Sequence, residues 1–521
     1  MALSRRAFLG GLTASSLTWP MRARAQSTTT TLPFRHGVAS GDPLRDRVIL
    51  WTRVTADAAI DVQWLVATDP ELTEIVAGGA SRTSAERDFT VKVDVGGLEP
   101  GQTYYYAFDL GRERSPVGRT KTTPDGNVDR VRLASVSCSN YPAGYFSVYR
   151  SLADRTDLDA VIHLGDYIYE FENGVLGNGT MLDRLPDPAH ELRTLEDYRR
   201  RYAQYRTDRD LQDAHRQHPF IVTWDDHELA NNAWRGGAAA HDPMTEGAWS
   251  ARRTAAHQAY MEWMPIRETE GLGIRLYRDI RFGSLVDLLM LDTRALRDQQ
   301  SSSLERDALS SPRRTLLGAE QEAWLHQQLR GSTASGTTWR LLGQQVMFSP
   351  LTPNEGPALN PDTWDGYRVE RKRLLELLAG GSVQNVAILS GDFHSSWAFD
   401  VPADPWSGYT GNTGEGSLAV ELLAPAISSP PLFADPTLRA QLSLLRPTLP
   451  HLRYLEGDRC GYVLVDVTAE RLQAEYHLVP DVRVPGLTAS RTVTLSCARG
   501  SAHLVESPLP VPEIAPTIPA P

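Results

Sequence analysis

The chain has 521 residues and a formal net charge of −11 at pH 7. This acidic balance argues against nucleic acid as a bulk electrostatic partner, although a bound cation can still attract small anionic substrates. Three cysteines exclude a disulfide framework, and no segment after the N-terminal leader approaches the roughly 20 apolar residues that span a bilayer.

Residues 1–25 have the pattern of an export signal. Arg5 and Arg6 precede a mildly apolar stretch, and Ala23-Arg24-Ala25 supplies a cleavage site of small residues. A twin-arginine (Tat) signal has these features in this order, whereas a chance N-terminal helix does not need them. We therefore expect recognition by the Tat export machinery, cleavage after Ala25, and a mature protein in the periplasm or outside the cell.

Residues 34–124 form the first predicted domain, and all of its predicted elements are strands. "RVILWTRV", "DVQWLVAT" and "TYYYAFDLG" are short, rich in β-branched and aromatic residues, and separated by turn sequences such as "LEPGQ". These features predict a small sandwich that resembles an immunoglobulin or fibronectin type III module. Pro124-Asp125-Gly126 marks its expected end.

Residues 130–490 alternate apolar strands with helical segments. Strands are expected at "VRLASVSC", "DAVIHLGD", "FIVTWDDHE", "WRLLGQQV" and "NVAILSGDFH", and helices near 145–154, near 196–216, at "GAEQEAWLHQQL" and at "YRVERKRLLELLAG". "GYVLVDVT" and "RLQAEYHL" predict a late hairpin. This organisation predicts a layered α/β domain with two sheets packed between helices.

The C-terminal region leaves two questions open. Cys460 and Cys497 lie in the same β-rich stretch, so they either pair after export or stay free, and Cys138 remains an unpaired thiol in both cases. Residues 498–521 are rich in proline and have no apolar period, which predicts an extended or disordered tail.

Candidate ligand side chains follow four apolar runs, at the ends of "LASVSC", "VIHLGD", "FIVTWDDH" and "VAILSGDFH". Ligands in layered α/β folds gather at the carboxyl ends of strands. A single carboxylate there is often a helix cap, but a buried carboxylate is costly unless it is paired or bound to a cation. Four such ends together predict a site for multivalent metal ions.

A set of ordered motifs runs along the chain from about residue 34 to 490. They are "GVASGDP", "VILWTRV", "SVSCSN", "GDYIYE", "WDDHELANN", "LDTR", "WDGY" and "SGDFHSS". Together they resemble the alkaline phosphatase D (PhoD-like) family of the calcineurin-like metallophosphoesterases, and the GD-x-x-Y motif also resembles the purple acid phosphatases. The resemblance implies a centre of one ferric iron and one or two calcium ions.

The resemblance assigns four residues to the iron. Asp166 matches the carboxylate that bridges the two metals, and Tyr169 matches the phenolate ligand of the purple phosphatases. Cys138 and His394 match further ligands to the same ion. The residues alone leave other interpretations open: a helix cap for Asp166, ordinary packing for Tyr169 and Cys138, and a surface loop histidine for His394.

The second metal position is predicted to be rich in oxygen. Asp226 and Asp392 stand where the purple phosphatases have asparagine and histidine, and Gln344-Gln345 stands where another histidine is expected. Oxygen ligands favour calcium over zinc or ferrous iron. Asp225 and Asn231 or Asn232 either complete this shell or cap a following helix.

Other motif residues have expected roles around the reaction. His227 is expected to transfer a proton to the leaving oxygen, with a supporting role as the alternative. Arg294 is expected to bind phosphate at the pocket mouth or else to form a buried ion pair. Trp364 and Tyr367 are expected around the same mouth. His163 is predicted to be a core residue, and no role is expected for His190, His215 and His257.

These expectations describe a secreted, metal-dependent phosphoester hydrolase. The resemblance implies release of phosphate from phosphomonoesters and phosphodiesters by attack of a metal-activated hydroxide, with a small-molecule or lipid phosphoester as substrate. A phosphodiesterase or phospholipase D-type enzyme with the same metal centre is the nearest alternative. A secreted binding protein with a degenerate phosphatase domain is the other, and we expect a monomer.

Overall fold

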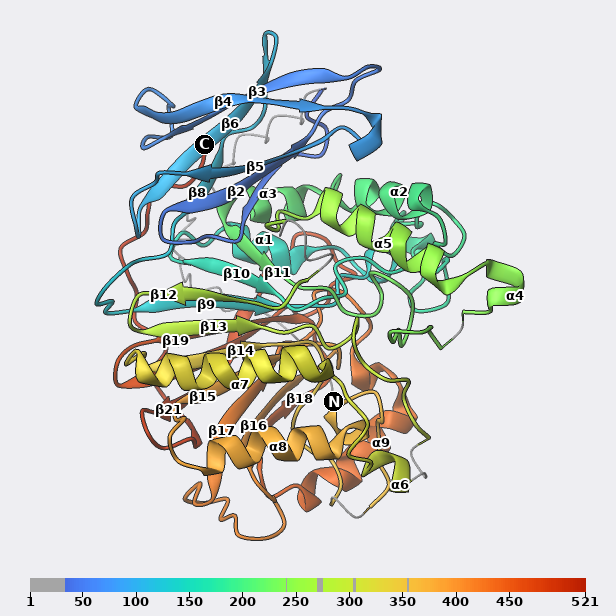
Figure 1. Ribbon diagram of the computed structural model, residues 1–521, viewed down its shortest axis with the longest axis vertical. Coiled ribbons are helices and arrows are strands. Elements are labelled where there is room, and N and C mark those ends of the chain that lie inside the picture. Colours follow the sequence, from blue (N-terminus) through green and yellow to red (C-terminus); the bar gives the residue numbers. More distant parts are fainter. Residues whose placement is uncertain (1–32, 240, 269–274, 303–305, 354–355) are drawn as a thin grey trace, which may run out of the picture.

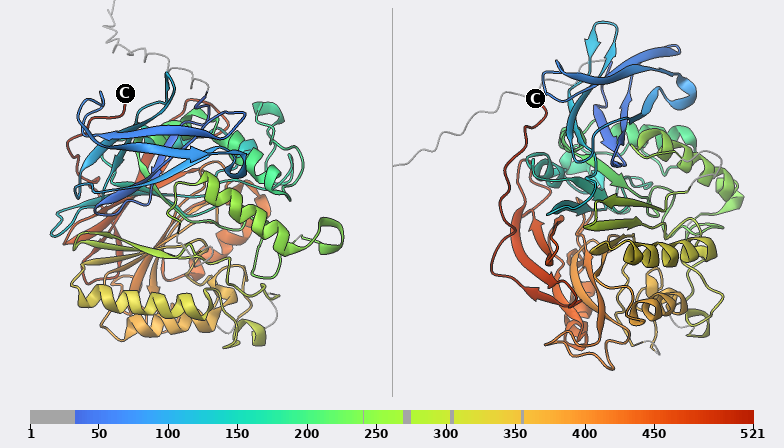
Figure 2. Two further views of the ribbon diagram at one scale, coloured as in Figure 1. Left: turned by 45° about the horizontal axis from the view of Figure 1, so that its top comes forward. Right: turned by 60° about the vertical axis from the view of Figure 1, so that its left-hand side comes forward.

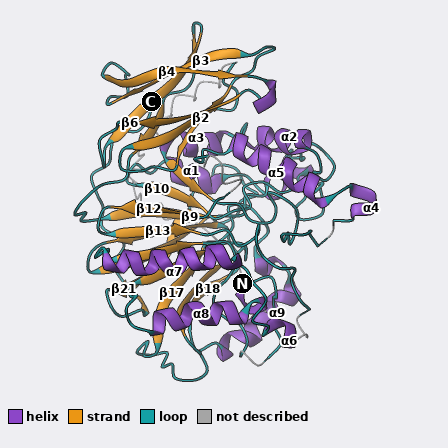
Figure 3. Ribbon diagram, in the orientation of Figure 1, coloured by secondary structure: helices purple, strands orange, loops and turns teal. Residues whose placement is uncertain are grey.

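The computed structural model describes residues 33–239, 241–268, 275–302, 306–353 and 356–521 (Figure 1). The expected export signal at residues 1–25 lies outside the described residues. The helices and strands of the protein form stacked layers. Two large sheets lie face to face, and helices cover the outer sides of these sheets (Figures 1 and 3). The predicted mixed α/β architecture with two sheets is confirmed.

Among the described residues, the larger sheet has ten strands in the order β22-β21-β20-β19-β9-β10-β11-β1-β2-β5. Its central strands β9, β10, β11 and β1 run parallel, and its outer strands pair antiparallel. The predicted late hairpin is β19–β20. The strands are β1 (Val38–Gly41), β2 (Arg47–Arg53), β5 (Thr90–Gly96), β9 (Val131–Val136), β10 (Ala160–His163), β11 (Pro219–Val222), β19 (Gly461–Val467), β20 (Arg471–Leu478), β21 (Ser490–Ala498) and β22 (Leu504–Glu506).

The second sheet has, in the part of the chain that the structure describes, seven strands in the order β12-β13-β14-β15-β17-β16-β18. Strands β13, β14, β15 and β17 are parallel, so their carboxyl ends share one edge. The strands are β12 (Arg278–Phe282), β13 (Val286–Met290), β14 (Trp339–Gly343), β15 (Val386–Ser390), β16 (Ser396–Pro402), β17 (Ser417–Leu423) and β18 (Leu452–Glu456).

Alternation of side chains along the central strands explains why the two sheets pack together. Within β13, Leu288 faces the core between the sheets, whereas Leu289 faces the core beneath the outer helices. Ile162 and Val161 of β10 divide in the same way between the inter-sheet core and the helices above. Strands that are buried on both faces read as continuous apolar runs, which is the pattern seen in the sequence.

Helices cover the outer faces of the two sheets. Helices α1, α2, α3 and α5 share a core with β9–β11, and α7 and α8 share one with β13–β15 (Figure 1). The helical stretch expected near 196–216 is two helices, because Asp208 caps a new one. In the described residues the α-helices are α1 (Ser147–Ala153), α2 (Leu195–Tyr205), α3 (Arg209–Gln217), α4 (Pro243–Glu246), α5 (Trp249–Trp263), α6 (Arg306–Leu309), α7 (Gly318–Ala334), α8 (Arg368–Ala379) and α9 (Pro436–Leu445).

The N-terminal strands form a sandwich that shares a sheet with the rest of the molecule. A five-stranded sheet packs its apolar face against β1, β2 and β5, which are the end of the ten-stranded sheet. Strand β1 pairs in parallel with β11, so the sheet continues across the boundary expected at Pro124-Asp125-Gly126. The strands of the smaller sheet are β3 (Ile60–Ala67), β4 (Ile75–Thr83), β6 (Thr103–Leu110), β7 (Glu113–Arg114) and β8 (Gly118–Lys121).

The C-terminal tail is extended and packed against the body, as the right-hand view of Figure 2 shows. The backbone amide of Val511 donates to Glu475 (2.7 Å), and Tyr105 donates its hydroxyl to the carbonyl of Ile518 (2.6 Å). Gln217 exchanges two hydrogen bonds with the backbone of Ala520 (3.0 and 3.1 Å). The sequence predicted an extended or disordered tail; the structure has the extended form, and its docking contacts were not predicted.

All three cysteines are free and buried. Cys460 directly precedes β19 and lies in the core beneath the helices, whereas Cys497 lies near the end of β21 in the core between the sheets. The possible Cys460–Cys497 disulfide is therefore absent from the structure. Within the described residues, no helix has the length and apolar content needed to cross a membrane.

Candidate metal centre

The residues expected at the site lie at the carboxyl ends of parallel strands from both large sheets. Cys138, Asp166 and Asp226 follow β9, β10 and β11 of the first sheet. Arg294 and Asp392 follow β13 and β15 of the second. The edges of the two sheets meet here: the amide of Ile427, beyond β17, donates to the carbonyl of Ser137, beyond β9 (2.8 Å). Candidate ligands that are more than 200 residues apart in the sequence therefore lie in one place.

Close backbone approach at Gly165 brings the first two aspartate loops together. A side chain at this position would lie 2.5 Å from both the Cβ and the backbone nitrogen of Asp225. Its φ of +106° also favours glycine. Glu228 fixes the same approach, because its buried carboxylate accepts from the amides of Asp166 (3.0 Å), Tyr167 (2.6 Å) and Asp225 (2.8 Å).

Four candidate ligands have left-handed backbone conformations. The φ angles of Cys138, Asp166, Asp392 and His394 are 63°, 56°, 63° and 48°. Such angles are uncommon for residues other than glycine and cost of order 1–3 kcal/mol each. Strain of this kind persists where the surrounding structure holds it, and here it turns side chains inward directly after each strand.

The first ligand group consists of Cys138, Asp166 and His394, which offer one atom each within 4.8 Å of one another. The hydroxyl of Tyr169 lies beside this group, 2.9 Å from Oδ2 of Asp166 and 3.1 Å from Nε2 of His394. The hydroxyl of Ser429 donates to the same Tyr169 oxygen (2.7 Å). The four residues that the sequence predicted as one ligand set therefore lie together.

The second ligand group consists of Asp225, Asp226 and Asp392, also within 4.8 Å of one another. Asp166, Asp226 and His227 form a third such group, so Asp166 and Asp226 link the two ends of the site. Oδ2 of Asp225 and Oδ1 of Asp226 are buried and have no hydrogen-bond partner among the described residues, and the Arg294 guanidinium lies 3.6 Å from Oδ1 of Asp226. Buried carboxylate oxygens without hydrogen-bond donors fit a cation.

The electrostatics of the cluster also fit a cation. Burial raises the pKa of Asp166 and of Asp225 well above the usual carboxyl range, and neighbouring carboxylates add to the effect. Burial raises the pKa of Asp392 to about 7, against the opposing effect of Arg294. Burial and the Asp166 charge likewise raise the pKa of Cys138 and Tyr169. A multivalent cation among these groups would reverse the shifts and hold them ionised.

Arg294 is buried in this cluster, so its expected place at the pocket mouth is wrong and the buried ion pair is what the structure has. Its guanidinium pairs with Asp225, with Asp362 (2.7 Å) and with Asp392 (3.2 Å). These carboxylates occupy all three nitrogens. Asp362 was not identified from the sequence, although it lies just before the "WDGY" motif. In the structure Asp362 also pairs with Arg297 (3.1 Å).

His227 is oriented by a carboxylate that the sequence analysis missed. Its Nδ1 lies 2.7 Å from Oε2 of Glu170, and its ring packs against Tyr169 with centroids 4.3 Å apart. Glu170 in turn accepts from the amide of Asn231 (2.6 Å). Burial lowers the pKa of His227, but Glu170 and the nearby aspartates outweigh it, and the net shift is well upward. The only sequence signal was an acidic residue directly after Tyr169.

Several other residues expected at the site lie in the core or contact the site through their backbone. Trp364 and Tyr367 are both 1% exposed and lie in the core beneath α7 and α8, so their expected place around the pocket mouth is wrong. Tyr367 donates its hydroxyl hydrogen to the carbonyl of Asp298 (2.6 Å). His163 is buried, as predicted. No helix directly follows the "WDDHELANN" motif, and the backbone amides of Asn231 and Asn232 donate to Glu170 and Asp226.

Gln344 and Gln345 are saturated with hydrogen bonds inside the protein. The side-chain nitrogen of Gln345 donates to Thr223 (2.9 Å) and to the carbonyls of Trp224 (2.6 Å) and Leu291 (3.1 Å). It thereby joins the loop after β11 to the loop after β13. Gln345 therefore holds the two sheets together at the site, whereas Gln344 donates to Ser390 (2.6 Å) and accepts from Trp364 (3.1 Å) beside the second sheet.

Comparison with known proteins identifies the family. A family model described as PhoD-like phosphatase matches residues 133–476, and one described as PhoD-like phosphatase, N-terminal domain, matches residues 20–124. Alkaline phosphatase D of Bacillus subtilis (strain 168) is 37% identical over 500 residues, which cover 92% of this chain and 83% of that protein. A solved structure described as "Structure of PhoD" superimposes with a TM-score of 0.83 and 35% identity, covering 91% of this chain and 92% of that one. The chain therefore belongs to the PhoD-like phosphatase family and is a phosphoester hydrolase.

Proposed function

We propose that this hydrolase is exported and releases phosphate from phosphomonoesters and phosphodiesters at a centre of two kinds of metal ion. The observation that carries the proposal is the sharing of Asp166 and Asp226 between neighbouring ligand groups. A carboxylate has two oxygens, so one residue can hold two cations a few Å apart. Such pairs of cations suit phosphoryl transfer, in which negative charge must be neutralised on several oxygens.

Ferric iron is the ion that suits the first group. Cys138, Asp166, Tyr169 and His394 would hold it, since thiolate, phenolate and imidazole together favour iron over calcium. Calcium suits the second group, where Asp225, Asp226 and Asp392 present only oxygen. When bound, these ions would polarise the phosphoryl group and lower the pKa of water, which supplies a nucleophile at neutral pH.

The side chains around the ions have separate tasks in this proposal. His227, held at Nδ1 by Glu170, transfers a proton at Nε2 to the leaving oxygen. Arg294 acts as a positioning residue, because its guanidinium spaces Asp225 and Asp392 and leaves their remaining oxygens for a cation. Burial of Asp166, Asp225, Asp226 and Arg294 keeps bulk water from this side of the site and strengthens their interactions.

The remaining parts of the proposal concern the protein as a whole. Residues 1–25 serve as a Tat signal, residues 34–124 and 130–490 act as an N-terminal and a catalytic domain, and the mature protein works as a monomer in the periplasm or outside the cell. Tat export suits a protein that folds around its metals before crossing the membrane. Release of phosphate there makes it available for uptake.

The test combines metal analysis with assays of two esters. Protein purified without added metal should contain iron and calcium and absorb visible light through phenolate-to-iron charge transfer. It should hydrolyse 4-nitrophenyl phosphate or bis(4-nitrophenyl) phosphate, and the faster reaction defines the ester class. Protein that carries stoichiometric metal but hydrolyses neither ester between pH 5 and pH 10 would refute the catalytic proposal.

A further inference from the structure

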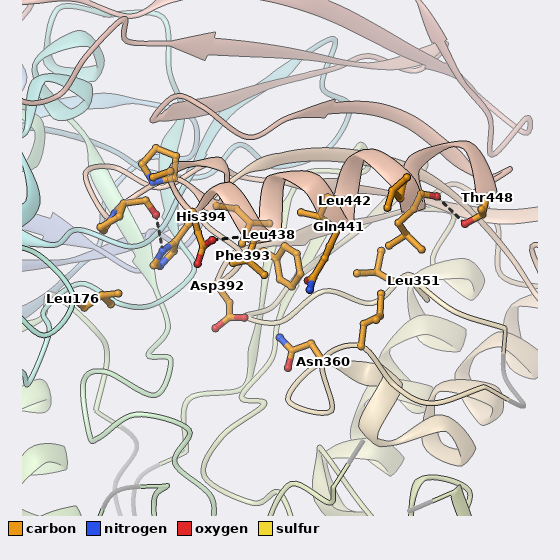
Figure 4. Close-up of a pocket in the computed structure, with 18 residues that line it drawn as sticks. Leu176, Leu351, Asn360, Asp392, Phe393, His394, Leu438, Gln441, Leu442 and Thr448 are labelled. Atoms are coloured by element: carbon orange, nitrogen blue, oxygen red, sulfur yellow. Dashed lines mark hydrogen bonds between the residues drawn. The ribbon is translucent and has the colours of Figure 1, made fainter. Parts of the chain in front are cut away.

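A large apolar chamber opens beside the candidate metal centre. Its volume is about 870 Å³, which is within the range of small-molecule sites. Figure 4 shows Asp392 and His394 at one end of the lining, and Leu351, Leu442 and Thr448 toward the other. Two candidate metal ligands therefore form part of the chamber wall, and the remainder of the wall is mainly leucine, proline and phenylalanine.

Helix α9 forms one long side of this chamber. Leu438, Leu442 and Leu445 follow at spacings of four and three residues, so they share one helical face and all line the chamber. Leu442 packs in a core with Leu351, which anchors the helix, whereas Leu438 remains 37% exposed. The helix thus offers unused apolar surface toward the chamber.

The opposite wall continues the apolar surface back to the metal ligands. Phe393 stands between Asp392 and His394 in the sequence and also lines the chamber. A phosphoester held by a cation at Asp392 would therefore have an ester group beside the chamber's apolar wall. Contiguous exposed apolar surface that borders a polar site is typical of a ligand-binding groove.

We propose that this chamber binds an unbranched alkyl chain attached to the substrate phosphate, so that the enzyme acts on amphiphilic phosphoesters presented as single molecules. This inference rests on the proposed function, because it assumes that the phosphate binds at the candidate metal centre. The alkyl chain would lie enclosed between α9 and the wall of Leu351 and Phe393. The proposed occupant of the chamber is neither a second protein copy nor a membrane surface.

Binding of n-alkylphosphonates tests the proposal without depending on turnover, since their P–C bond is not hydrolysed. Isothermal titration calorimetry with metal-loaded, full-length mature protein would compare methyl-, butyl-, hexyl- and octylphosphonate below their micelle concentrations. Each added methylene should lower Kd about threefold to fourfold, which corresponds to about 0.8 kcal/mol of burial. A Kd that stays constant from methyl to octyl would overturn the chain-binding proposal.

Matched variants locate the chain. Leu438→Gln should reduce the octyl-to-methyl affinity ratio about tenfold, because it places a polar group on the chamber face of α9. Gln441→Leu should steepen the chain-length dependence, since Gln441 also lines the chamber. Leu185→Gln is the control, because Leu185 is 54% exposed and lies outside the chamber lining. Equal losses in Leu438→Gln and Leu185→Gln would count against the assignment.

Two further outcomes distinguish a failure of the chamber proposal from a failure of the proposed catalytic function. If the protein hydrolyses neither nitrophenyl ester but octylphosphonate still binds tightly, the catalytic proposal fails and the chamber proposal stands. If both esters are hydrolysed but chain length has no effect, the reverse holds. Binding that occurs only to phospholipid vesicles or micelles, with no affinity for the monomeric chain, would overturn the proposal in favour of surface attachment.

Discussion

The imidazole Nδ1 of His227 lies 2.7 Å from Oε2 of Glu170, and both side chains are buried. A carboxylate at one ring nitrogen fixes the ring's orientation and leaves the other nitrogen for chemistry. The two residues come from different strand ends, β11 and β10, so the geometry depends on the parallel pairing of these strands. The pair is therefore a direct product of the sheet topology.

Replacement of Glu170 tests this relationship. Glu170→Gln keeps the size of the side chain but removes the negative charge, so we expect kcat to fall about tenfold to hundredfold while KM changes little. Because Glu170 raises the pKa of His227, the decline of kcat at alkaline pH should begin at lower pH in the variant. Initial rates across pH check both effects, and an unchanged profile would show that Glu170 has only a structural role.

Tyr169 is predicted to give the protein its colour. Tyr169→Phe removes the phenolic oxygen near Asp166 and His394 but keeps the ring that packs on His227. We expect visible absorbance to disappear while circular dichroism and the thermal unfolding midpoint remain close to those of the parent. Absorbance that survives the substitution would exclude the phenolate as a ligand.

Arg294 and Arg297 form a matched pair for testing the buried acidic cluster. Both pair with Asp362, but only Arg294 also pairs with Asp225 and Asp392. Arg294→Gln should destabilise the protein by about 3–5 kcal/mol and lower its calcium content, because carboxylates lose their buried partner. Arg297→Gln should cost stability without loss of calcium. Urea unfolding and metal analysis measure these effects, and equal calcium loss in both variants would contradict the assignment.

Removal of metal is expected to destabilise the folded protein. Ions that bind only the native state add about 2.7 kcal/mol at a concentration one hundred times Kd. Treatment with a calcium chelator should therefore lower the thermal unfolding midpoint and abolish hydrolysis, and added calcium should restore both. A midpoint that does not respond to the chelator would show that the acidic cluster is stable without a cation.

Acid should unfold the protein through buried histidines that are not candidate metal ligands. Burial lowers the pKa of His451 to about 3, from an ordinary 6.5, and His36, His218 and His257 also shift to about 3. Between these values the unfolded chain binds more protons, so stability is full above pH 6.5 and falls as the pH drops toward 3. Each histidine should cost about 2 kcal/mol between pH 6.5 and pH 5.

Urea unfolding at several pH values measures this dependence. His451→Gln should reduce its slope, because one buried titrating group is removed. His190→Gln is the control, since the His190 side chain is 64% exposed, and it should leave the slope unchanged. Equal slopes in the parent and His451→Gln would contradict the proposed origin of the acid sensitivity.

The sequence predicted the strand ends better than it predicted their partners. Cys138, Asp166, Asp226 and His394 end apolar runs, and parallel strands bring such ends to one edge of a sheet. Glu170 and Glu228 were missed because an acidic residue in a loop has no local pattern that reveals which amide or imidazole it will contact. Their roles become visible only when β10 and β11 lie side by side.

Trp364 and Tyr367 were misplaced for a related reason, and the same reason left two roles open for Arg294. Their motifs indicated a place around the pocket mouth, but depth below the surface depends on packing between helices and sheet. Arg294 is held inside by carboxylates that come from three separate segments. The shared sheet at β1 and β11 was also not foreseen, because a boundary rich in proline and glycine indicates a break in the chain and not where the flanking strands pair.

The strand order of the ten-stranded sheet has a consequence for synthesis on the ribosome. Strand β1 emerges early, but its neighbour β11 is made almost 180 residues later, and β9 must wait for β19, more than 300 residues further on. The nascent chain therefore carries unpaired strand edges until translation is nearly complete, and such edges invite aggregation. Shortening the gene from its 3′ end should consequently yield insoluble product well before any ligand of the metal centre is lost.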